Sequence, residues 1–214
     1  MTDQPKAPEG TAADLIASGL RLFGKKGFAA TSTREIAAAA RTNVASIAYH
    51  FGGKEGLRRA CGVEVIRRMG TVLGNHTAPV PEAPQAAVAE MEATLRSMCA
   101  FVTTSPVAAP LVPFMLREVG EGGAIFDLVY GAMIEPVHRR LCTLWAVATG
   151  QEAESPRTRL LVFSLIGQLL YFRVGRPVVT RRMGWDTLGP AEAGEIADLL
   201  AANLHSLLER ERRS

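Results

Sequence analysis

Residues 31–57 read TSTREIAAAARTNVASIAYHFGGKEGL, and no other segment of the chain indicates the fold as strongly. Within it, 33–40 and 44–51 are short, mostly apolar segments separated by three residues. Ser32 is well placed to cap the first segment as a helix and Asn43 to cap the second, because their short side chains accept hydrogen bonds from free backbone N–H groups. Two helices of about eight residues joined by such a break have the proportions of a helix-turn-helix.

Capping signals place helices on both sides of this segment. Glu35 completes a capping box at the start of the first short helix, and Thr11 with Asp14 has the same form further upstream. The helix that Thr11 begins is expected to end near Gly27, because glycine often follows the last turn. A longer helix over 54–72 is expected after the second short one.

The remaining two-thirds of the chain carries the periodicity of long helices. We expect the prolines at 106, 110 and 113 to make an irregular or capped segment, and we expect a break at 120–123. Pro136 is expected to kink its helix or open it locally, since proline removes a backbone donor. The further helices are expected over 85–104, about 124–148, 156–175 and 190–209. With about nine helices and no convincing strand, the predicted fold class is all-α.

The composition is that of a globular protein. With 214 residues, 48% of them hydrophobic and 21% charged, the chain can bury a sizeable core. Cys61, Cys99 and Cys142 lack metal-ligand spacing and are expected to be buried, reduced thiols. The most apolar run, 160–174, is shorter than the roughly 20 residues that span a bilayer. We therefore expect no metal, no cofactor, no membrane association and a cytoplasmic location.

The charge is distributed unevenly along the chain. Residues 1–70 carry 11 Lys and Arg against 6 acidic residues, net +5, whereas 71–214 carry 13 against 15, net −2. An anionic partner would therefore meet the first third of the chain. Taken alone, the excess is also compatible with an ordinary solvated surface.

Signals for catalysis are absent from the sequence. Neither the H-E-x-x-H pattern of metalloproteases nor the G-x-S-x-G pattern of serine hydrolases occurs. The four histidines share no spacing with cysteines or acidic residues that suggests a metal site or a catalytic triad. We expect no catalytic residues and no enzymatic activity.

Each of the two short helices in the 31–57 segment has an apolar side that can be buried and an opposite side that can face a partner. Ile36 and Ile47 can pack against Leu20 and Phe23 of the preceding helix. The other side of the second helix carries small residues that allow a close approach to the floor of a DNA major groove. An ordinary three-helix bundle, in which small residues only permit close packing, fits the same pattern.

Several motifs resemble those of a known family. Over about 11–60, the residues that carry the resemblance are Gly27-Phe28, Thr31-Ser32, Ile36-Ala37 with Ala40, and Ile47 to Leu57. They resemble the amino-terminal domain of the TetR family of bacterial transcriptional regulators. Further along, 114–118, 136–142 and 165–168 resemble the carboxyl-terminal domain of the CecR subgroup. The resemblance implies a DNA-binding domain over 11–70 and an effector-binding and dimerisation domain over 71–214, after a tail at 1–10 that its composition predicts to be disordered.

The resemblance also implies roles for individual residues toward a double-stranded DNA operator. Arg34 falls where a side chain reaches a base edge, and Lys54 where the start of a helix meets a phosphate. The full predicted DNA-binding set is Ser32, Thr33, Arg34, Asn43, Val44, Ala45, Ser46, Tyr49, His50 and Lys54. Two positions depart from the family pattern. Arg41 stands where the turn usually has glycine and must tolerate a positive φ or a different turn, and Ala48 replaces a tyrosine.

The rear domain is predicted to make a homodimer and to hold a small molecule. The helices at about 156–175 and 190–209 would pair with their copies, although a helix at the centre of a monomer would be equally apolar. Residues that could line a pocket for a hydrophobic or amphipathic effector are Phe101, Met115, Arg117, Phe126, Tyr130, His138, Trp145, Gln168 and Tyr171. The alternatives are a plain core for the apolar residues, an Arg117–Glu118 ion pair, and a surface or internally satisfied His138.

These observations predict a ligand-responsive transcriptional regulator, acting as a repressor, that binds a palindromic operator as a homodimer. The alternative is a helical small-molecule sensor that does not bind specific DNA sequences.

Overall fold

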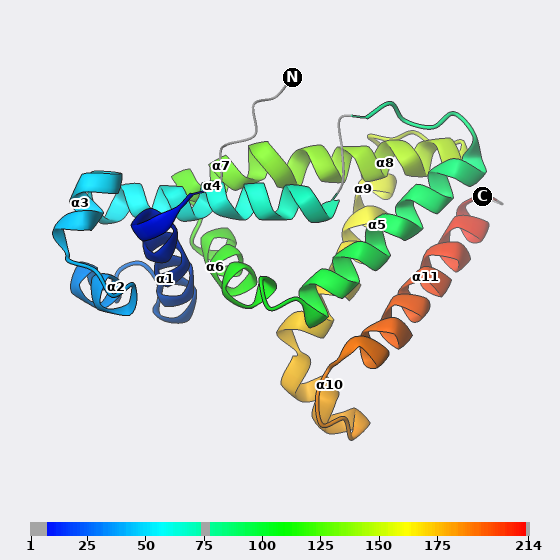
Figure 1. Cartoon of the computed structure of the whole chain (residues 1–214). Coiled ribbons are helices and arrows are strands. Elements are labelled where there is room, and N and C mark those ends of the chain that lie inside the picture. Colours follow the sequence, from blue (N-terminus) through cyan, green and yellow to red (C-terminus); the bar gives the residue numbers. More distant parts are fainter. Residues whose placement is uncertain (1–7, 74–77, 213–214) are drawn as a thin grey trace. The chain divides into compact units, whose positions relative to one another are not determined.

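The computed structural model describes residues 8–73 and 78–212, and every regular element in that part of the chain is helical (Figure 1). The all-α prediction is therefore confirmed. The helices are α1 (Gly10–Lys26), α2 (Thr33–Ala39), α3 (Ala45–Phe51), α4 (Lys54–Leu73), α5 (Pro84–Thr104), α6 (Ala108–Glu121), α7 (Ala124–Val129), a π-helical turn (Tyr130–Ile134), α8 (Glu135–Thr149), α9 (Pro156–Val174), α10 (Arg176–Met183) and α11 (Pro190–Arg212). Most of the tail predicted at 1–10 lies outside the described residues.

The described chain divides into two compact units. The first contains the residues up to Thr71 together with Ala109–Met133, and so comprises α1–α4, α6 and α7. The second contains α5 and α8–α11. The sequence-based scheme assigned 109–133 to the rear domain, whereas in the structure these residues belong to the first compact unit.

The core of the first unit forms where the three amino-terminal helices meet α4 and α6. Leu20, Phe23, Ile36 and Ile47 are almost completely buried, as the apolar pattern predicts. Phe114 of α6 joins them, with its ring centroid 6.4 Å from that of Phe23. The helix-turn-helix therefore rests on a core that α6 helps to build.

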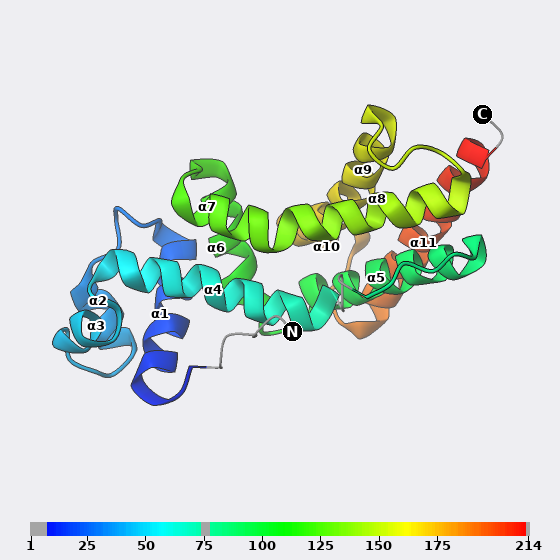
Figure 2. The ribbon, with the colours of Figure 1, turned by 90° about the horizontal axis from the view of Figure 1, so that it is seen from above.

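The core of the second unit lies among α5, α8, α9 and α11. In both views α5 runs beside α11 (Figures 1 and 2). Trp145 of α8 is completely buried in this core. The other core residues come from all four helices and are Ala87, Met91, Leu95, Val137, Leu141, Cys142, Leu144, Ala148, Val162, Leu165, Leu204 and Leu208.

Three local predictions were wrong or incomplete. The first helix begins at Gly10 with Glu9 as its amino-terminal flanking residue, so Thr11 lies inside the helix and caps nothing. The proline-rich segment is helical from Ala108, with Pro110 in the first turn, where no helical hydrogen bond is lost, and Pro113 inside the helix. The short helix α10 was not predicted, and it follows α9 almost without a break.

The prediction for Pro136 is confirmed. A π-helical turn precedes it, and α8 restarts at Glu135 with the proline in its first turn. The ring that cannot donate a hydrogen bond is accommodated by this local widening of the helix.

Candidate nucleic-acid interface

The start of α2 is fixed by the predicted capping box. The Ser32 hydroxyl accepts a hydrogen bond from the Glu35 N–H at 3.2 Å, and the Glu35 carboxylate accepts one from the Ser32 N–H at 3.0 Å. Lys26, at the end of α1, also donates to this carboxylate. The hydrogen bond from Lys26 and those from Ser32 lower the pKa of Glu35 to about 2. The helix therefore begins with an ionised, well-anchored glutamate.

The turn between α2 and α3 is tight. Arg41 has a φ of 53°, so of the two alternatives, a positive φ or a different turn, the structure has the positive φ. The Thr42 N–H donates to the Ala37 carbonyl at 2.9 Å, which closes the end of α2. Asn43 acts as the predicted cap, because its Oδ1 accepts a hydrogen bond from the Ala45 N–H at 2.6 Å. The first turn of α3 therefore has one of its free backbone N–H groups satisfied.

The two sides of α3 differ sharply in burial. Ile47 is 1% exposed, whereas Tyr49 is 86% exposed and contacts the neighbouring ring of His50 edge-on at 5.0 Å. All ten residues predicted to bind DNA lie in the first unit. Seven are exposed (Ser32, Arg34, Asn43, Val44, Ala45, Tyr49 and His50), and three are partly exposed (Thr33, Ser46 and Lys54). None of them is part of the core.

The junction of α3 and α4 is a tight turn that places Lys54 at the start of α4. Gly52 ends α3 in the left-handed conformation that favours glycine. A Cβ on Gly56 would lie 1.8 Å from the Phe51 carbonyl oxygen, so no larger residue fits there. The Lys54 ammonium lies 4.2 Å from the centre of the Phe28 ring, a cation–π contact that holds this lysine at the first turn of α4.

Many of the basic residues in the first unit are neutralised within it. Arg67 and Arg68 both bind the Glu64 carboxylate, which is almost fully buried. Burial alone would raise the pKa of Glu64, but the hydrogen bonds from these arginines hold it below its ordinary value. The first unit also includes 109–133, which add one arginine and three acidic residues. Its formal charge is therefore +3 rather than the +5 of residues 1–70.

The cations left without an ion pair in the described part of the unit gather around the helix-turn-helix. They are Arg21, Lys25, Arg34, Arg41, Lys54 and Arg59, together with Arg117, which donates to backbone carbonyl oxygens at the end of α1. The distribution of unpaired charge, and not the net charge, thus favours this region as the surface that meets an anion. Counting charges along the sequence could not separate paired from unpaired arginines.

Two arginines attach α6 to the helices of the first unit. Arg58 of α4 binds Glu118 through two hydrogen bonds of 2.9 Å and also contacts Glu121 at 3.2 Å. Arg117 of α6 donates to the carbonyl oxygens of Gly24 and Lys25 at 3.0 and 3.1 Å. Arg117 therefore caps the carboxyl end of α1. The expected Arg117–Glu118 ion pair is absent, because Glu118 pairs with Arg58.

The residues predicted to line an effector pocket are divided between the two units. Met115, Arg117, Phe126 and Tyr130 belong to the first, where the rings of Phe126 and Tyr130 lie 5.7 Å apart. The remaining five, Phe101, His138, Trp145, Gln168 and Tyr171, belong to the second. Phe101, His138 and Trp145 are buried, Gln168 is partly exposed and Tyr171 is 56% exposed.

His138 has its hydrogen-bonding atoms occupied within the second unit. Its Nε2 lies 3.2 Å from the Arg159 carbonyl oxygen and its Nδ1 lies 3.7 Å from the Cys142 sulfur. Its ring stacks on that of Phe163, with 3.9 Å between centroids. These contacts fit the alternative of a satisfied histidine. Of the buried side-chain N and O atoms that the structure describes, only Trp145 Nε1 lacks a hydrogen-bond partner.

The cysteines form no further site. Cys61, Cys99 and Cys142 are buried and free, and burial raises the pKa of the Cys142 thiol to about 11. Over residues 8–73 and 78–212, no group of His, Cys, Asp or Glu side chains is arranged to hold a metal ion. In the same residues no single helix is long and apolar enough to cross a membrane, although α5 and α6 taken together are, by length and composition only.

Comparison with known proteins agrees with this architecture. Residues 15–61 match the model of bacterial regulatory proteins of the tetR family, and 87–209 match that of the carboxyl-terminal domain of the HTH-type transcriptional dual regulator CecR. CecR of Shigella flexneri is 33% identical over 202 residues, covering 91% of this chain and 90% of that protein. The regulatory protein RaaS of Mycobacterium tuberculosis is 28% identical over 163 residues, covering 73% and 69% of the two chains.

Solved structures share the fold at lower identity. AibR in complex with isovaleryl coenzyme A and operator DNA has a TM-score of 0.67 at 18% identity, covering 90% of this chain and 96% of AibR. A TetR-like regulator from Rhodococcus has a TM-score of 0.63 at 19% identity, covering 96% and 97%. With both family models matched in order and the similarity to CecR extending over nine-tenths of its length, the chain belongs to the TetR family of DNA-binding transcriptional regulators, with a rear domain of the CecR type.

Proposed function

We propose that this regulator represses transcription by binding a palindromic operator as a homodimer, and that a hydrophobic or amphipathic effector releases it. The observation that carries the proposal is the outward side of α3. Val44, Ala45, Tyr49 and His50 are exposed there, opposite the buried Ile47, and none of them contributes to the core. A helix that presents small and polar side chains on a fixed support is suited to the major groove.

The roles proposed for the individual residues follow from their places on this surface. Arg34 lies in the first turn of α2 with no ion pair, so its guanidinium is free to bind a guanine edge. Ser32 and Thr33 at the start of α2, and Lys54 at the start of α4, are proposed to bind phosphates. The side-chain oxygen of Asn43 accepts a hydrogen bond at the start of α3, which leaves its NH2 group to donate to DNA.

The dimer is proposed to form through α9 and α11. One face of α9 exposes apolar residues at helical spacing, namely Leu160, Phe163, Gly167, Tyr171 and Val174, and α11 exposes Leu199. An apolar, solvent-facing stripe such as that of α9 is typical of a surface that a partner covers. A second copy that pairs the same two helices would bury this stripe, together with Leu199 of α11, in a twofold interface.

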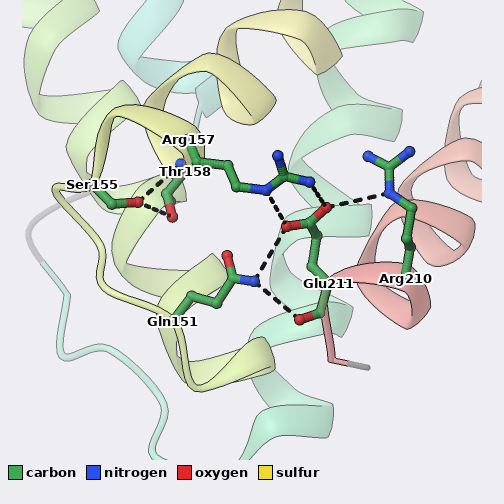
Figure 3. Close-up of polar contacts among 6 residues, drawn as sticks. All are labelled: Gln151, Ser155, Arg157, Thr158, Arg210 and Glu211. Atoms are coloured by element: carbon green, nitrogen blue, oxygen red, sulfur yellow. Dashed lines mark hydrogen bonds and ion pairs between the residues drawn. The ribbon is translucent and has the colours of Figure 1, made fainter. Parts of the chain in front are cut away.

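A polar network connects the start of α9 to the end of α11. Figure 3 shows the buried Glu211 carboxylate between Arg157 and Arg210, with Gln151 on its other side. The hydrogen bonds from Arg157, Gln151 and Arg210 lower the pKa of Glu211 to about 2, and that from Arg157 contributes most. The carboxylate therefore stays charged over the physiological range.

Effector control is proposed by analogy with the fold and from the attachment of α6. AibR, with a TM-score of 0.67, was solved with an acyl coenzyme A and operator DNA together. In this chain Arg58 and Arg117 connect α6 to α4 and α1. A ligand that prefers a different position of α6 would therefore shift the helix-turn-helix away from its DNA-binding state.

Two substitutions test the proposed docking. Arg34→Ala should cost roughly 1–3 kcal/mol of binding free energy and relax the preference at one base pair. Lys54→Ala should weaken binding to all sequences alike and flatten the salt dependence of affinity. Arg182→Gln, which removes an exposed charge on α10 of the second unit, is the matched control. If both test variants bound like the control, the docking model would be wrong, and a helical sensor without specific DNA binding would be the better description.

A further inference from the structure

Arg41 is the only residue other than glycine with a positive φ in the described part of the chain. A side chain in this conformation is strained, because its Cβ crowds the backbone, and glycine adopts it freely. The turn is held by backbone hydrogen bonds, with the Arg41 N–H donating to the Ala38 carbonyl at 3.1 Å. The arginine side chain itself is exposed and makes no ion pair or hydrogen bond. It therefore strains the turn without stabilising the fold in return.

The position of Arg41 brings its charge close to the proposed groove-binding end of α3. It precedes the capping residue Asn43 by two residues, so the two Cα atoms are at most about 7.6 Å apart. The major groove is about 12 Å wide, so its edge is about 6 Å from a helix end that lies in its middle. A long arginine side chain at this turn is within reach of a phosphate at that edge.

A second free cation lies beside Arg41. Arg21 of α1 and Arg41 line the same open hollow of about 450 Å³, together with Asp14, Ser18 and small residues of α2. Arg21, like Arg41, has no ion pair. Two guanidinium groups against one carboxylate leave this hollow positive, and an unneutralised positive hollow next to the helix-turn-helix attracts the phosphate backbone.

We propose that Arg41 binds a backbone phosphate of the operator at the edge of the groove that α3 enters. This contact explains why an arginine occupies a turn that suits glycine, since strain at one residue is retained where its side chain serves binding. The inference rests on the proposed docking of α3 and adds to it a residue that replaces the glycine usual in the family.

The test compares variants of the full-length protein that separate charge from backbone strain. Arg41→Gly removes both, Arg41→Gln removes only the charge, and Arg41→Lys keeps the charge. Binding is measured by fluorescence anisotropy on two 30-base-pair duplexes, one selected by the wild-type protein from a random pool and one of scrambled sequence. Thermal unfolding of each variant is followed by circular dichroism, and Arg182→Gln is again the control.

Loss of one phosphate contact should lower affinity by roughly 5- to 10-fold per protomer near 0.1 M salt and reduce the salt slope by about 0.9. We expect this loss for both Arg41→Gly and Arg41→Gln on both duplexes, with Arg41→Lys near the wild type. Only Arg41→Gly should also raise the unfolding midpoint, by about 2–4 °C. A Gly variant that binds both duplexes with unchanged affinity and salt slope would overturn the proposal.

The same data distinguish this inference from the docking on which it rests. A wild-type protein that bound the two duplexes equally would contradict sequence-specific docking of α3. The role of Arg41 is judged separately, from the ratio of variant to wild-type affinity on each duplex. A Gln variant whose affinity falls on the selected duplex alone would show a base contact and would overturn the assignment to phosphate.

Discussion

Removing the Arg58 side chain should destabilise the DNA-binding unit selectively. Arg58 places two hydrogen bonds of 2.9 Å on Glu118, whose side chain is only 4% exposed, while the Arg58 side chain itself is 16% exposed. Arg58→Met would leave the Glu118 carboxylate buried without its main partner. Breaking a buried pair in this way costs about 3–5 kcal/mol, and the remaining exposure of Arg58 favours the lower end, about 3 kcal/mol.

The assay uses the positions of the two tryptophans. Trp145 and Trp185 both lie in the second unit, so their fluorescence reports on that unit, whereas circular dichroism reports on the helices of both. With a urea m-value of about 1–2 kcal/mol/M for a unit of this size, a loss of 3 kcal/mol moves its midpoint by about 1.5–3 M. We expect an early phase in circular dichroism and an unchanged fluorescence transition.

Two further variants make the reasoning refutable. Replacing both partners, Arg58→Met with Glu118→Leu, should recover most of the loss, because no buried charge remains. Arg139→Met, which removes exposed pairs with Glu135 and Glu154, should change stability by less than about 0.5 kcal/mol. If Arg58→Met matched Arg139→Met, or if the double variant were no better than the single one, the ion pair would not hold α6 in place as described.

Three other outcomes are expected. Gly56→Ala should destabilise the first unit by about 3 kcal/mol or more in urea unfolding, because its Cβ would lie 1.8 Å from the Phe51 carbonyl oxygen; Gly70→Ala in the same helix, with open space around its Cβ, should instead stabilise slightly. Because the pKa of Glu211 is lowered to about 2, its contribution to stability is complete above about pH 4.5 and is lost as the pH falls toward 2. Glu211→Gln should therefore make the unfolding midpoint less dependent on pH between about 4.5 and 2. Leu160→Glu, at a position 68% exposed in the single chain, should give a monomer by light scattering, and a dimer would contradict the proposed interface.

The local elements of the DNA-binding unit could be predicted from the sequence because their signals are local. The capping box at Ser32, the Asn43 cap and the left-handed Arg41 all depend on a few neighbouring residues, and the structure has each of them. Pro136 was equally informative, since a missing backbone donor must be accommodated wherever it falls in a helix.

The long-range arrangement could not be predicted in the same way. Nothing near Arg117 in the sequence indicates that it caps α1, more than 90 residues earlier, or that Glu118 pairs with Arg58. Apolar periodicity showed that 109–133 is helical in part but not that it packs with the first 71 residues. The residue type is the only signal in the sequence for the effector residues, and the structure divides them between two units, so the pocket stays a prediction.

The central claim, that this chain binds a palindrome as a dimer through α3, is tested most directly by selecting bound sequences from random duplexes with the full-length protein. The account predicts an enriched palindrome whose half-sites lie about one helical turn, or 34–36 Å, apart. It also predicts that Leu160→Glu loses the paired half-sites. Enrichment of no sequence, or of a single half-site without symmetry, would contradict the account.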